Sequence, residues 1–189
     1  MSNTDSAIDP IQVKKRLDET IALLQALGLP RRQQNERSAL TLLALLDLTP
    51  DKPWFEASNP QYGITPMMDF FARYYGKQYK PNTRETVRRQ TVHQYLEAGM
   101  ITANPDDLER PVNSPHVVYQ IEQSTLDLLQ TYGTLAWAQN LQAYLASRET
   151  LKSRYAQERM LQRLPVILPS GEELRLSSGG QNVLIKEIH

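Results

Sequence analysis

Residues 82–99 decide the fold prediction, and they read NTRETVRRQTVHQYLEAG. At about 100° per residue, the apolar side chains of this stretch fall on one side of a helix; they are Val87, Val92, Tyr95, Leu96 and Ala98. Asn82, followed three residues later by Glu85, predicts a helix start in which each side chain accepts a hydrogen bond from the other residue's backbone N–H. Gly99 is the expected end. We therefore expect an amphipathic helix over 83–98.

Further helices are expected before this stretch. Apolar residues recur at helical spacing over 11–27 and 35–46, and the second pattern is dense enough for a mostly buried helix. A helix over 67–75 is expected to open at Thr65-Pro66, a cap followed by a proline in the first turn, and to end at Gly76.

Two short strands and two more helices are expected after it. Segments 100–102 and 117–121 are rich in β-branched and aromatic residues, and a polar, proline-containing loop separates them. Helix–turn–helix followed by a hairpin with a long loop is the order of a winged helix. Helical periodicity returns over 125–132 and 135–163, and 164–168 with 173–176 predicts a second hairpin. The expected fold class is mainly α: a winged helix-turn-helix with additional N-terminal helices, a long C-terminal helix and a short β-hairpin tail.

Composition excludes several classes of protein. The 189 residues are 22% charged and 40% hydrophobic, which is typical of globular domains. The absence of cysteine excludes disulfides and thiolate metal sites. No apolar run approaches a membrane span, and the polar start lacks a secretory signal, so we expect a cytoplasmic protein without a membrane partner.

Basic residues are concentrated in two regions, although 21 cations balance 21 anions overall. Segment 77–94 holds five cations against Glu85 alone, and segment 148–163 holds five against two glutamates. Local clusters of this kind, rather than the net charge, indicate contact with nucleic acid. Double-stranded DNA is the expected partner.

The side of the 83–98 helix opposite its apolar side carries the candidate base-reading residues. They are Thr86, Arg89, Gln90 and His93, and arginine and glutamine are the side chains that best read guanine and adenine edges. Residues around the helix start are candidates for phosphate contact: Lys80, Asn82, Thr83, Arg84 and Arg88. In the loop of the predicted hairpin, the candidates are Arg110, Asn113 and Ser114. The alternatives are an ordinary solvated helix face and a structural loop stiffened by prolines.

The sequence predicts no complete catalytic site, no metal site, no cofactor and no small-molecule substrate. The three histidines lie far apart, and no two of them have the i, i+4 spacing of a zinc site. Asp106, Asp107 and Glu109 could imitate a metal site, but carboxylates in a loop are usually solvated.

Several stretches resemble the BsuBI/PstI-type restriction endonuclease family. The specific ones are KPNTRETVRR at 80–89 and RPVNSP at 110–115. The resemblance continues through segments 91–94, 104–106, 119–121, 132–133, 168–171 and 176–182, so it covers roughly residues 36–188. Gln181 and Val183 depart from it, because the family pattern there has a histidine and an acidic residue.

The resemblance implies the amino-terminal helix-turn-helix region of a type II enzyme. Such enzymes recognise a short palindrome as a dimer and cut it with Mg²⁺, and their nuclease domain begins about where this chain ends. The expected division is therefore a helical extension (1–34), a winged-helix DNA-binding domain (35–133), a long connecting and dimer-forming helix (134–163), and the start of a truncated nuclease domain (164–189). Whether the chain is itself an enzyme stays open. A stand-alone winged-helix regulator of a restriction or phage-defence operon and a helical protein-interaction module are the alternatives.

Overall fold

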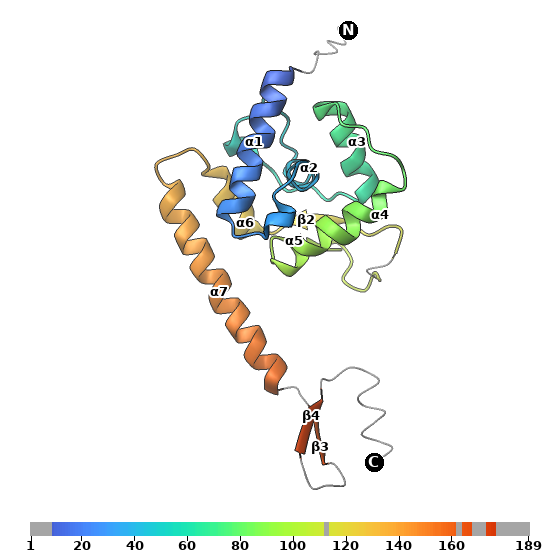
Figure 1. Ribbon diagram of the computed structural model, residues 1–189, viewed down its shortest axis with the longest axis vertical. Helices are drawn as coiled ribbons and strands as arrows, with labels where there is room; N and C mark the ends of the chain where they lie inside the picture. The colour runs from blue at the N-terminus through green and yellow to red at the C-terminus, as the bar shows by residue number, and fades with distance from the viewer. Residues whose placement is uncertain (1–8, 112–113, 162–163, 168–172, 177–189) are drawn as a thin grey trace. The chain divides into compact units, whose positions relative to one another are not determined.

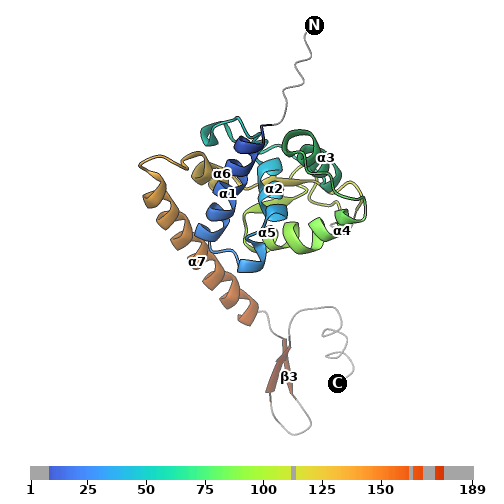
Figure 2. The same ribbon diagram turned by 45° about the horizontal axis from the view of Figure 1, so that its top comes forward.

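The computed structural model describes residues 9–111, 114–161, 164–167 and 173–176, with side chains described as far as residue 149. Its contacts group the chain into two units, Met1–Tyr144 and Leu145–His189. The first unit is mainly helical (Figures 1 and 2), which confirms the expected fold class. The four-part division of the chain stays a prediction.

Helix α2 (Glu36–Leu45) lies at the centre of the first unit (Figure 1). Its start is capped by Asn35, whose Oδ1 accepts a hydrogen bond from the Ser38 backbone N–H at 3.0 Å. Every residue from Ser38 to Leu45 is buried, as the dense apolar pattern predicts. Helix α1 (Pro10–Ala26) packs against α2, and its Leu23 and Leu24 enter the same hydrophobic core. The N-terminal helix is therefore part of this core.

Helix α3 (Ile64–Tyr75) begins earlier than the sequence predicts. Gly63 occupies the cap position, so the expected cap at Thr65 is wrong. The fourth helical stretch is continuous but has three parts: α4 (Thr83–Val87), a π-helical turn (Arg88–Val92) and α5 (His93–Glu97). We call this stretch the 83–97 helix. The end of α3 needs a left-handed residue, which Gly76 supplies with φ 65°.

Strands β1 (Ile101–Ala103) and β2 (Tyr119–Ile121) form the expected antiparallel hairpin, with Ile101 opposite Ile121. Tyr62 pairs with the other edge of β2 through two backbone hydrogen bonds to Tyr119, of 3.0 and 2.9 Å. The order helix α2, Tyr62 bridge, α3, 83–97 helix and hairpin is that of a winged helix. The hairpin loop, residues 104–118, takes the place of the wing.

Two further helices follow. Helix α6 (Gln123–Gln130) buries Leu126 and Leu129 in the core, and α7 spans Trp137–Leu161. The tyrosine ring of Tyr132 packs between Trp54 and Trp137, with ring centroids 4.9 and 5.0 Å away. The short helices η1 (Arg31–Gln33) and η2 (Trp54–Glu56) complete the helical elements of the first unit's described residues.

The second unit contains the predicted tail hairpin, β3 (Leu164–Ile167) paired antiparallel with β4 (Glu173–Leu176). The expected helix start beyond residue 180 lies outside the described residues.

Candidate nucleic-acid interface

The 83–97 helix presents a polar face to solvent, as its sequence predicts. Arg89, Gln90 and His93 are exposed, whereas Val87 and Tyr95 are fully buried. Thr83, Thr86 and Arg88 are half-buried at the sides of this face. Tyr95 anchors the helix, because its hydroxyl donates a hydrogen bond of 2.6 Å to the backbone carbonyl of Ser38 in α2. Burial raises the pKa of Tyr95 well above its usual range, so this hydroxyl keeps its proton.

A π-helical turn at Arg88–Val92 interrupts the 83–97 helix. The His93 backbone N–H donates to the carbonyl of Arg88, five residues earlier, so the turn is wider than an α-helical one. The adjacent side chains of Thr91 and Val92 in this turn both lie in the interior. A spacing of 100° per residue also places Thr91 on this side, because it lies four residues after Val87 and four before Tyr95.

Gln33 stabilises the π-helical turn from outside the helix. Its side chain is only 3% exposed; its Nε2 donates to the Gln90 backbone carbonyl at 2.6 Å, and its Oε1 accepts from the Ser38 hydroxyl at 3.0 Å. A π turn leaves a carbonyl without its usual helical partner, and a buried carbonyl needs one. Gln33 therefore links η1 and α2 to the middle of the polar face formed by Arg89, Gln90 and His93, which we call the reading face.

We expect Gln33→Leu to lower the free energy of unfolding by about 1–3 kcal/mol, because it leaves the Gln90 carbonyl and the Ser38 hydroxyl without this partner. Urea unfolding followed by circular dichroism measures the change. Gln25→Leu, on the exposed side of α1, is the matched control and should stay within about 0.5 kcal/mol. Equal effects of both substitutions would contradict the role of Gln33.

Glu85 binds the two central arginines of the helix. Its carboxylate accepts hydrogen bonds from Arg88 Nη2 at 2.7 Å and Arg88 Nε at 3.0 Å, and it also accepts one from Arg89 Nε. The bond from Arg88, with Arg89 adding to it, lowers the pKa of Glu85 to about 2, so the carboxylate is ionised at neutral pH. The predicted capping pair is therefore wrong: Asn82 has a helical backbone and makes no side-chain cap bond, and Glu85 points to the arginines.

Four of the predicted residues meet in one groove. Asn82, Arg84, Arg88 and Ser114 line a space of about 420 Å³ between the helix start and the wing loop. A neighbouring groove of about 310 Å³ brings Arg88, Arg89 and His93 together with the hairpin residues Ala103 and Tyr119. Lys80, Arg84 and Arg89 are exposed. In the described part of the chain, neither Lys80 nor Arg84 forms an ion pair, so both cations are available to an anionic partner.

The wing loop is held closed at its base by Asn104, which is 2% exposed and has φ 50°. Asn104 Oδ1 accepts from the Val118 backbone N–H at 3.2 Å, and Asn104 Nδ2 donates to the Arg110 carbonyl at 3.0 Å. The Arg110 guanidinium pairs with Asp106 at 2.7 Å. This hydrogen bond keeps the pKa of Asp106 below its ordinary value. Arg110 thus organises the loop, and its predicted DNA contact stays a prediction. Asn113 lies outside the described residues.

Sequence reasoning missed the arginines of η1 and α2. Arg37 Nη2 donates to Gln90 Oε1 at 3.0 Å, and Arg32 Nη2 donates to Gln94 Oε1 at 3.4 Å. The signal that could have found them is the segment RRQQNER at 31–37, which holds three arginines. The predicted boundary at residue 34 divided this segment between an extension and the DNA-binding domain.

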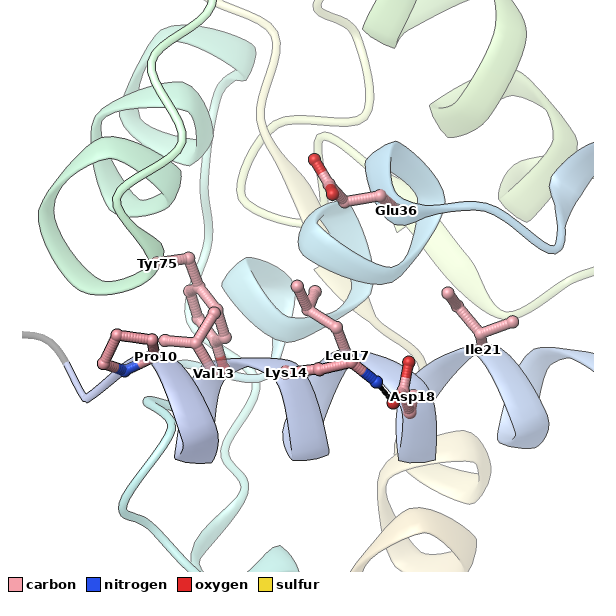
Figure 3. Close-up of a pocket in the computed structure, with 8 residues that line it drawn as sticks. All are labelled: Pro10, Val13, Lys14, Leu17, Asp18, Ile21, Glu36 and Tyr75. Atoms are coloured by element: carbon pink, nitrogen blue, oxygen red, sulfur yellow. Dashed lines mark hydrogen bonds and ion pairs between the residues drawn. The ribbon is translucent and has the colours of Figure 1, made fainter.

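Other surfaces of the first unit offer less chemistry. A groove of about 510 Å³ between α1 and α2 is lined largely by apolar side chains, and its Lys14 and Asp18 are paired with each other at 2.7 Å (Figure 3). No group of three or more His, Asp or Glu side chains that could hold a metal ion occurs among the described residues. None of the helices described combines the length and hydropathy needed to cross a membrane.

Comparison with known proteins agrees with this arrangement. Residues 14–153 match the family described as the BsuBI/PstI restriction endonuclease HTH domain. Over 170 residues, 90% of the chain, the sequence is 52% identical to the type II restriction enzyme BsuBI of Bacillus subtilis and 38% identical to the type II restriction enzyme AplI of Arthrospira platensis. The solved structure of the SdaI restriction endonuclease matches 91% of the chain, with a TM-score of 0.68 and 33% identity. The chain spans 54%, 52% and 54% of these three proteins, about half of each.

Proposed function

This chain belongs to the BsuBI/PstI restriction endonuclease family, and on that premise we propose that it binds double-stranded DNA sequence-specifically, as the recognition region of a type II restriction enzyme. The observation that carries the proposal is the anchored 83–97 helix. Its buried side is fixed to α2 by Tyr95, and its exposed side offers Arg89, Gln90 and His93. A helix of this kind fits the major groove of B-DNA.

The side chains on this helix suit distinct contacts. Arg89 can donate two hydrogen bonds to guanine, and Gln90 can both donate to and accept from adenine. Arg84 and Lys80, at the helix start, suit phosphate oxygens, which position a protein without reading sequence. Glu85 is the internal anion that these contacts must compete with, since it binds Arg88 and Arg89 when no DNA is present.

We further propose a palindromic target read by a two-fold dimer, because two-fold protein symmetry is matched by two-fold symmetry of the site. Helix α7 (Trp137–Leu161) is the proposed dimer surface. Cleavage with Mg²⁺ is the activity proposed for the whole restriction enzyme. The described residues offer no carboxylate cluster for the metal, so no step of cleavage is assigned to them.

A stand-alone regulator is the weaker interpretation. The similarity to the two restriction enzymes extends over 170 of the 189 residues, so it includes residues beyond the winged helix. If the chain were a regulator that shares only the DNA-binding fold, its similarity to these enzymes would be confined to the winged helix.

Selection from a randomised duplex pool tests the proposal. The 189-residue chain is expected to enrich one short palindromic sequence and to bind it at least about 10³-fold more tightly than random duplex, the lower end for specific DNA-binding proteins. Fluorescence anisotropy on the selected duplex and on a shuffled duplex measures the ratio. Equal affinity for both duplexes would overturn sequence-specific binding, and an enriched sequence without two-fold symmetry would overturn the palindrome.

A further inference from the structure

We propose that Arg32 and Arg37 form a second phosphate-binding site, for the DNA backbone, beside the 83–97 helix. This inference rests on the proposed function, and it extends the interface into η1 and α2. The site is a groove of about 320 Å³, which we call the η1 groove. Its lining residues come from η1, α2 and the 83–97 helix; they are Arg32, Gln33, Arg37, Arg89, Gln90 and Gln94.

The charge of the η1 groove is the first argument. Three guanidinium groups line it, and none of its six lining residues is acidic. Within the described residues, Arg32 and Arg37 form no ion pair, and their side-chain partners are the neutral groups of Gln94, Gln90 and Thr91. The neighbouring carboxylate of Glu36 is bound to Lys77 at 2.6 Å. Two cations therefore face this groove without neutralisation.

The order of these side chains is the second argument. Arg37 is held at two nitrogens, with Nε 3.3 Å from the Thr91 hydroxyl and Nη2 3.0 Å from Gln90 Oε1. The buried Gln33 ties η1 to the Gln90 carbonyl, so the backbone between the two arginines is also fixed to the helix. A planar guanidinium held in this way suits the paired oxygens of a phosphate, and little side-chain entropy remains to be lost on binding.

The position of the groove is the third argument. Arg84 and Arg88 line the groove beside the wing loop, whereas Gln90 and Gln94 line the groove beside η1 and α2. The η1 groove and the groove that Arg84 shares with Ser114 have no lining residue in common, so they are two separate grooves along the 83–97 helix. A helix in the major groove has a phosphate backbone on each side. Each of the two grooves would then contact the phosphate backbone of a different DNA strand. These two contacts would fix the direction in which Arg89 approaches the bases.

The test compares the chain with a double variant, Arg32→Gln/Arg37→Gln, on the selected duplex and on the shuffled duplex between 50 and 200 mM salt. Each lost phosphate contact should reduce the slope of log K against log salt by about 0.9, so the expected reduction is about 1.8, with equal losses of affinity on both duplexes. The matched control, Lys15→Gln/Arg73→Gln, removes two exposed cations from α1 and α3 and should keep the original slope. Arg32→Gln alone provides the same test, with a reduction of about 0.9, if the double variant fails to fold.

The outcomes separate the two proposals. If the unchanged chain binds neither duplex, the proposed function fails and this inference fails with it. If the chain binds but the double variant keeps the original salt slope, only the η1 groove assignment is overturned. A variant that loses affinity for the selected duplex alone would also overturn it, because the arginines would then read bases rather than phosphates.

Discussion

Replacing Arg89 with alanine is expected to weaken binding to the selected duplex by about 1–3 kcal/mol, which is roughly 5- to 150-fold, and to weaken binding to shuffled DNA much less. The reason is that Arg89 is exposed at the centre of the reading face, where its guanidinium can make two hydrogen bonds to one guanine. Release from Glu85 is part of the measured change, since that ion pair must open for the contact to form. Anisotropy titrations at one fixed salt concentration measure both affinities.

Lys80→Ala is the matched control for this experiment. Lys80 is exposed just before the helix, so its loss should weaken both duplexes alike and reduce the salt slope by about 0.9. Arg89→Lys should keep the charge but lose the paired contact, and it should resemble Arg89→Ala on the selected duplex. If Arg89→Ala leaves both affinities unchanged, the 83–97 helix does not read the target, and the wing loop becomes the next candidate.

Replacing Tyr95 with alanine is expected to lower the free energy of unfolding by about 3–5 kcal/mol, the range for removing a large buried aromatic side chain. Tyr95 is 0% exposed, and its ring and hydroxyl fix the 83–97 helix to α2. Because small domains have only about 5–15 kcal/mol of stability, this is a large part of the total. Urea unfolding measures the loss.

Tyr95→Phe separates packing from hydrogen bonding. It keeps the ring and removes only the bond to the Ser38 carbonyl, so the expected loss is about 1 kcal/mol. Tyr74→Ala, in α3 and half-buried, serves as a second control and should cost less than Tyr95→Ala. If Tyr95→Ala and Tyr74→Ala have equal costs, Tyr95 is not the anchor of the helix.

Local patterns in the sequence were enough to predict the helices and the hairpin. The spacing of Val87, Val92 and Tyr95 placed the buried side of the 83–97 helix correctly, and the β-branched residues near Ile101 placed the first strand. Helix starts were less reliable. Asn82 has the composition of a cap but not its backbone conformation, because the turn before it already bonds the Thr83 N–H to the Lys80 carbonyl.

The parts of the candidate site that were missed depend on contacts between distant residues. Gln33 and Gln90 are 57 positions apart, and Arg37 and Thr91 are 54 apart. The periodicity of a helix or a strand relates only residues that are close in the sequence. Neither the π-helical turn nor the η1 groove could therefore be predicted from the spacing of residues. The competition of Glu85 for Arg88 and Arg89 was also missed, although all three residues lie within five positions, because the sequence pattern matched a capping pair instead.

Asn104 gives the wing a property that matters over evolution. Its backbone N–H donates to the Val118 carbonyl at 2.8 Å, and its side chain accepts from the Val118 N–H, so the two ends of the loop are joined directly to each other. Doubling the length of a closed loop costs only about 0.6 kcal/mol in chain entropy. Insertions in the exposed part of this loop should therefore leave the sheet intact.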